Sequence, residues 1–186
     1  TAEAIPRFRD WFSKHVGDIG NAAALEPDKG GLNVEGLAWD PSKGRLLFGI
    51  RTPTQNGSPI LVPVKVLDVH GAWIGENLAV EPAIRLVVED TGDEEGIRGI
   101  EYDPTRSAFL VIVGNATSMS RAPFQLYTWD GNAEGRATRY PNVWFDKKIK
   151  AESITHATVG GTGAIVVADD AGGYAVLLDS DPRLKS

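Results

Sequence analysis

Residues 34–41 read VEGLAWDP and are followed at residues 45–51 by RLLFGIR. A closely similar pattern returns at residues 97–104, IRGIEYDP, and residues 108–115, AFLVIVGN. Each pair predicts a short strand, a tight turn at Asp-Pro and a strongly apolar second strand, which together form an antiparallel hairpin. A pattern that recurs along the chain indicates a repeat architecture.

A third, weaker copy lies at residues 151–157, AESITHA, and residues 163–170, GAIVVADD. With Gly36, Gly99 and Ser153 as equivalent positions, the repeat spacings are 63 (99 − 36) and 54 (153 − 99). These spacings suit one four-stranded antiparallel sheet per repeat, which is the unit of a β-propeller blade.

Further strands are predicted between and after the hairpins, where apolar segments are bounded by turn residues. These segments are residues 59–67, 83–89, 124–129, 136–140 and 173–179. The third repeat stops short of an outer strand. We therefore expect an all-β chain with about three propeller-like blades, forming a partial or half propeller. The expected blades are residues 32–90, 96–142 and 150–186.

The first 31 residues differ from the repeats. Apolar side chains from Ile5 to Val16 recur near the helical period, and Pro6 suits a first helical turn. We expect a short amphipathic helix over residues 5–16. Residues 17–31 are rich in Gly, Ala, Asp and Pro, and we expect a loop there.

Composition excludes several classes of protein. The net charge of −6 and the lack of a basic run disfavour a nucleic-acid surface. With no cysteine, the chain has no disulfide, thiolate nucleophile or cysteine-ligated zinc. No apolar run approaches the roughly 20 residues that span a bilayer. The compartment stays open between cytoplasm and periplasm.

About three blades are fewer than the four to eight that usually close a propeller. The ends of an open array expose apolar faces and strand edges, which favours association. Two explanations are preferred: a homodimer that closes one ring, or N-terminal blades of a longer chain that are missing here. A third alternative is a different β architecture.

The repeat motifs also resemble a known family. Residues 31–40, GLNVEGLAWD, and residues 47–53, LFGIRTP, resemble a bacterial domain family of unknown function with E-G-L-A and G-x-R-x-P blade motifs. Residues 96–100, 150–154 and 166–170 resemble its later blade starts and ends, although Ser153 replaces the usual glycine. The resemblance implies a propeller-like fold and no established activity. Its E-G-L-A element is also similar to motifs of phytase-like esterase and lactonase-type propellers.

Equivalent positions in the repeats carry charged residues. Glu35, Arg98 and Glu152 begin the innermost strands, and Arg51 ends a second strand. The start of each innermost strand meets one face of a propeller, so we expect these four residues to converge. They are candidates for binding a small-molecule ligand through the forked guanidinium groups. The alternative is a set of ion pairs that locks one blade to the next.

A cation site is a second hypothesis for the same face. Glu35, Asn115, Glu152 and Asp169 offer the oxygen ligands that calcium prefers. We expect a ligand-binding or interaction scaffold. The alternative is a calcium-dependent hydrolase of phosphoester or lactone type, and enzymatic activity stays open.

Two further features have structural interpretations. His156 aligns with Trp39 and Tyr102, so we expect a packed histidine with a hydrogen-bond partner; the three histidines lack zinc-ligand spacing. The acidic residues 90–96 lack EF-hand spacing and are expected to form a solvated connection between blades.

Overall fold

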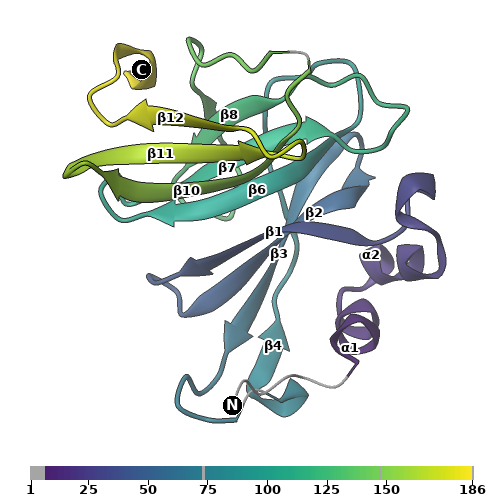
Figure 1. The fold of residues 1–186 in the computed structure, drawn as a ribbon. Helices are drawn as coiled ribbons and strands as arrows, with labels where there is room; N and C mark the ends of the chain where they lie inside the picture. The colour runs from purple at the N-terminus through teal and green to yellow at the C-terminus, as the bar shows by residue number, and fades with distance from the viewer. Residues whose placement is uncertain (1–6, 73, 147, 186) are drawn as a thin grey trace.

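The structure is a computed structural model that describes residues 7–72, 74–146 and 148–185. Three antiparallel sheets make up most of it (Figure 1), which confirms the all-β class. The first sheet contains β1 (Asn33–Asp40), β2 (Arg45–Gln55), β3 (Ser58–Val66), β4 (Leu78–Val80) and β5 (Ile84–Arg85). The second contains β6 (Glu95–Asp103), β7 (Ala108–Asn115), β8 (Gln125–Trp129) and β9 (Thr138–Arg139). The third contains β10 (Ala151–Val159), β11 (Thr162–Asp169) and β12 (Tyr174–Leu178).

Strand number differs between the sheets. In the part of the chain that the structure describes, the second sheet alone has the four strands expected of every repeat. In the first sheet, β4 and β5 both pair with β3, at opposite ends of it. The predicted fourth strand at residues 83–89 is wrong in extent, because only Ile84 and Arg85 form β5. Val87 instead exchanges backbone hydrogen bonds with Gly135 and Ala137 of the second sheet. The third sheet ends at three strands, as the sequence indicated.

The N-terminal segment is more helical than expected. Helix α1 (Phe8–His15) falls within the predicted range, whose first two residues lie outside the described part of the chain. The expected loop over residues 17–31 is wrong in part, because it contains α2 (Asp18–Asn21), η1 (Ala22–Ala24) and η2 (Pro27–Lys29). Two further 3₁₀ turns are η3 (Gly75–Asn77) and η4 (Pro182–Leu184). Within the described ranges, none of the helices is long and apolar enough to cross a membrane.

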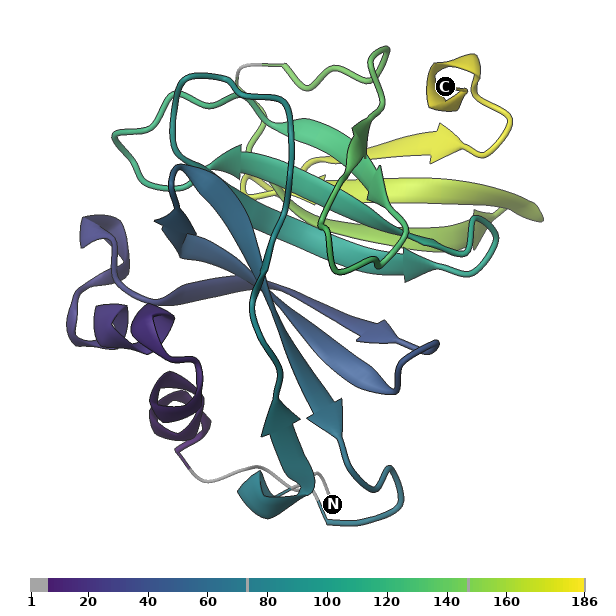
Figure 2. The same cartoon turned by 180° about the vertical axis from the view of Figure 1, so that it is seen from behind.

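The sheets pack in chain order. The innermost strands β1, β6 and β10 lie side by side, with β6 in the middle (Figures 1 and 2). One buried cluster joins Leu47 and Leu61 of the first sheet to the second sheet. Another joins Leu110 and Leu126 of the second sheet to the third. Both faces of β7 are therefore buried, which explains why its sequence is apolar almost without interruption.

Two glycines let the first and second sheets approach closely. Gly36 and Gly49 face each other on β1 and β2, and Ile97 of β6 packs over them. A Cβ atom added at Gly49 would lie 2.4 Å from Cγ2 of Ile97, well inside contact distance. The glycine pair thus makes the space that a branched side chain of the next sheet fills.

Helix α1 covers the other face of the first sheet. Phe12 of α1 packs with Phe48 of β2, their ring centroids 5.0 Å apart, in a cluster that includes Ile60 and Val62 of β3. By register, Phe48 corresponds to Val111 of β7 and Val167 of β11, which face the preceding sheet in their repeats. The helix therefore covers much of the face that a preceding sheet would occupy.

Candidate functional site

Each innermost strand begins with a β-bulge. The pairing register skips Glu35 in β1, Arg98 in β6 and Glu152 in β10, the equivalent residue of every repeat. A bulge leaves one residue outside the regular ladder and redirects its side chain. The three charged side chains thus leave the sheets at corresponding points, which agrees with the spacings of 63 and 54 in the sequence.

Arg98 occupies the centre of this group. It is only 3% exposed, and its Nε lies 3.1 Å from Oε2 of Glu35. Its Nη2 pairs with Oε1 of Glu152, and its guanidinium lies over the ring of Phe124, 5.3 Å from the centroid. One cation from the second sheet therefore joins carboxylates from the first and the third.

Arg51 completes the group from the first sheet. Its Nη1 donates to Oε1 of Glu35 at 2.9 Å, and its Nε donates to the backbone carbonyl of Ala116 at 2.9 Å. Asn33 also donates to Oε1 of Glu35, at 3.0 Å. The structure thus brings together all four residues predicted to bind a ligand, and it pairs their charges with one another.

Burial affects the acidic members of the group. Burial is the largest influence on Glu152 and raises the pKa of its carboxyl. Arg98 opposes this shift, and the negative charge of Glu35 adds to it. Two carboxylates thus share one guanidinium in a partly buried place, so removal of Arg98 would leave Glu152 without its cation and Glu35 with Arg51 alone.

The four residues proposed for calcium do not gather in the same way. Oδ1 of Asp169 accepts hydrogen bonds from the backbone of Ala171 and Gly173 at 3.0 and 2.6 Å, within its own turn. The side-chain amide of Asn115 donates to the carbonyl of Thr117. Across the described ranges, no three His, Asp or Glu side chains are grouped so that they would hold a metal ion.

A second polar group lies at the opposite end of the innermost strands. Nε2 of His156 is 3.0 Å from Oδ2 of Asp179, and its Nδ1 is 3.9 Å from Oδ1 of the fully buried Asp103. Arg106 pairs with both aspartates. His156 is therefore a packed histidine with a carboxylate partner, as its place in the repeat predicted.

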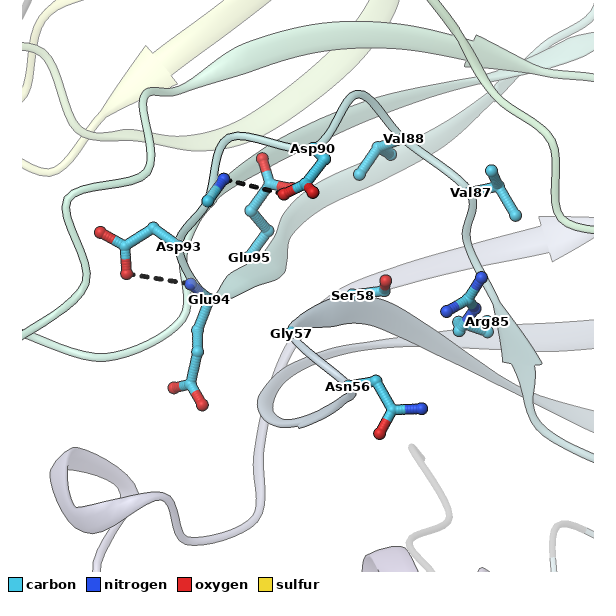
Figure 3. A pocket seen from close by; sticks show the side chains of 11 residues that line it. Asn56, Gly57, Ser58, Arg85, Val87, Val88, Asp90, Asp93, Glu94 and Glu95 are labelled. Atoms are coloured by element: carbon cyan, nitrogen blue, oxygen red, sulfur yellow. Dashed lines mark hydrogen bonds between the residues drawn. The ribbon is translucent and has the colours of Figure 1, made fainter.

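A depression lies between the first and second sheets, on the side of the β2–β3 turn (Figure 3). Its volume is about 560 Å³, and Glu95 lines it with Asp90 and Arg85. Burial raises the pKa of Glu95 to about 7, and the negative charges of Asp90, Asp93 and Glu89 contribute. The Thr91 hydroxyl lies beside this carboxyl and lowers its pKa somewhat, although the two lack normal hydrogen-bond geometry.

The prediction of a solvated connection over residues 90–96 is wrong at Glu95, whose side chain is buried. Comparison of equivalent positions in the three repeats could have indicated that Glu95 is buried. At the equivalent position the first repeat has Leu32, which is buried, and the third has Ile149. A carboxylate at a position that is apolar in the other repeats marks an exception to the packing pattern.

Comparisons with known proteins give no further identification. No protein-family model matches the chain, no curated protein matches it, and no solved structure matches it.

Proposed function

We propose that this protein is a propeller-like interaction scaffold, whose three sheets are blades that associate with a second copy of the chain. One observation carries the proposal. Tyr174 of β12 is 77% exposed, whereas the residues at the same register position, Leu61 of β3 and Leu126 of β8, are 0% exposed. In the two internal interfaces this position is covered by the following sheet.

The surface around Tyr174 is apolar and uncharged. Val176 and Leu178 lie on the same face of β12, because side chains alternate along a strand, and both are exposed. Val166 of β11 and Thr155 of β10 pair in register beside Val176. This face of the third sheet thus has the chemistry of the buried faces that precede it in the chain.

The first sheet offers a matching element. Leu37 of β1 is 56% exposed, while its counterparts Ile100 of β6 and Ile154 of β10 are buried against the preceding sheets. Most contact between neighbouring sheets comes from this innermost strand. Because α1 covers β2 and β3 but leaves Leu37 exposed, β1 is the part of the first sheet available to another copy.

Head-to-tail packing of β1 on the third sheet of a second copy would give two equivalent interfaces about a two-fold axis. Two chains of three sheets would supply six blades, a number that closes a propeller. The resemblance of residues 31–53 to a propeller-like family supports the same arrangement.

The internal interfaces also use a polar contact that the new interface would lack. Lys43, in the first hairpin turn, donates to the carbonyl of Gly131 in the second sheet. The equivalent Arg106 pairs with Asp179 beside the third sheet. The third hairpin turn, residues 159–162, has no basic side chain, so we expect association between chains to be weaker than packing within one.

The test is the mass of the chain in solution by light scattering, with the chain mass of 20.0 kDa as reference. We expect a dimer for the wild type and for the control Met119→Asp, and a monomer for Tyr174→Asp and for Leu37→Asp. Met119 is a suitable control because it is an exposed hydrophobic residue in the loop between β7 and β8.

Mixing the two disrupted variants tests the head-to-tail geometry. A heterodimer of the two variants has one interface in which both faces are wild type, so we expect the mixture to dimerise in part. A monomeric wild type, or a dimer that Tyr174→Asp leaves intact, would overturn the proposal.

A further inference from the structure

The depression between the first and second sheets has fixed walls. The backbone N–H of Leu86 donates to Pro59 of β3 at 2.9 Å, and that of Val87 donates to Gly135, beside β9, at 2.7 Å. At the other side, the N–H of Glu95 donates to the carbonyl of Gly57 in the β2–β3 turn at 2.9 Å. Backbone hydrogen bonds to both sheets therefore hold its shape in the free protein, as in most small-molecule sites.

Glu95 forms a buried wall of this depression. Its side chain is on β6, it is 3% exposed, and its Oε1 has no hydrogen-bond partner among the residues that the structure describes. Buried polar atoms are nearly always paired, and a buried carboxylate without a cation is costly. An unpaired carboxyl oxygen beside a depression of about 560 Å³ leaves room for a partner from outside the chain.

The two sides of the depression differ in charge. Figure 3 shows Asp90 and Glu95 on one side and Arg85 on the other. Arg85 is exposed and forms no ion pair with any residue in the described ranges. Val88 lies between the two ends in this view and Val87 lies beside Arg85, and both valines line the depression.

We propose that this depression binds a small amino acid-like zwitterion, with the ligand's ammonium group at Glu95 and Asp90 and its carboxylate at Arg85. The two carboxylates neutralise the ligand's ammonium group, and the forked guanidinium donates hydrogen bonds to the two oxygens of the ligand carboxylate. The aliphatic part of the ligand lies against the valines. This site is distinct from the scaffold interface, so the oligomeric state and the binding are tested separately.

The experiment is calorimetric titration of the full chain at pH 8 with a series of ω-amino acids, from glycine through 4-aminobutyrate to 6-aminohexanoate. Hexylamine and hexanoate, which each carry one of the two charges, are the comparison ligands. We expect one chain length to bind more tightly than the others and than either singly charged ligand, because the two ends of the site are a fixed distance apart.

Three variants separate the contributions. Glu95→Gln should weaken binding of the preferred amino acid at least about tenfold, because the ligand's ammonium loses its buried counter-charge. Arg85→Ala should reduce the affinity for the preferred amino acid to that for hexylamine. It should leave the affinity for hexylamine unchanged. Glu76→Gln, an exposed acidic residue on η3, should change nothing.

Two results would overturn the proposal. One is the absence of a heat of binding for every amino acid at ligand concentrations up to about 10 mM, since weaker association is not specific recognition. The other is equal binding of hexylamine and the amino acids together with no effect of Arg85→Ala, which would indicate only a general attraction to an acidic surface.

Discussion

Nε of Arg98 lies 3.1 Å from Oε2 of Glu35, and both residues occupy the bulge at the start of the innermost strand of their sheet. Glu152 occupies the third such bulge and pairs with the same guanidinium. Three positions that are 63 and 54 residues apart thus form one ion-pair network. Its charges lie within ion-pair distance of one another, although Nε of Arg98 and Oε2 of Glu35 lack hydrogen-bond geometry, and this arrangement favours a role in holding the sheets together.

Removal of the central cation should destabilise the fold strongly. Arg98→Met removes the guanidinium that the carboxylates of Glu35 and Glu152 share. We expect a loss of about 3 kcal/mol in the free energy of unfolding. Arg183→Met breaks only the solvent-screened pair with Asp181 and should lower the free energy of unfolding far less. Urea unfolding of both variants measures the difference, and equal losses would contradict the structural role of the network.

Glu95 should make stability depend on pH. Its pKa in the folded protein is about 7, above the ordinary value of 4.5. Below pH 4.5 the carboxyl is protonated in both states, so it costs nothing there. As the pH rises from 4.5 to 7 the unfolded state loses its proton more readily, so stability falls and then stays lower.

Glu95→Gln should therefore raise the free energy of unfolding at pH 8 and change it little at pH 4. Denaturant titrations at the two pH values test this, with Glu76→Gln as the exposed control. A substitution that stabilises equally at both pH values would show that ionisation of Glu95 is not the cause.

Asp103 should contribute more to the stability of the fold than an ordinary turn residue does. Its Oδ1 accepts the N–H of Thr105 at 2.8 Å, its Oδ2 pairs with Arg106, and the side chain is fully buried. We expect Asp103→Asn to lower the melting temperature by an amount equivalent to about 1–3 kcal/mol. Asp130→Asn alters a similar turn contact at an exposed site and should have a clearly smaller effect; comparable shifts for the two would contradict this prediction.

The close approach at Gly49 should be sensitive to a single methyl group. Gly49→Ala places Cβ against Cγ2 of Ile97 and near Cα of Gly36, and we expect it to cost about 2 kcal/mol of stability. Ile97→Ala removes Cγ2, the atom closest to the added methyl group, but leaves a cavity. The double variant should lose less than the sum of the two single losses, as a double-mutant cycle measures. Additive losses would mean that the two positions do not compete for the same space.

Much of the fold was predictable because the repeats are local. The alternation of polar and apolar residues, the Asp-Pro turns and the apolar second strands each specify a hairpin over about 20 residues. The equivalent positions of Glu35, Arg98 and Glu152 followed from the spacing. The fourth strand of the first sheet was predicted too long, because Val87 leaves that sheet and pairs with residues 135–137 of the second, a contact that only tertiary packing decides.

Sequence alone thus determined the all-β class, the hairpins and the equivalence of the three charged positions, since these depend on periodicity and turn residues near one another in the chain. Tertiary structure decided which charges pair, that α1 covers β2 and β3, and that Glu95 lies unpaired beside a depression. Those features depend on how separate sheets face one another. The physical reason is that a charge or an apolar side chain acquires its partner, or lacks one, only when distant segments are packed together.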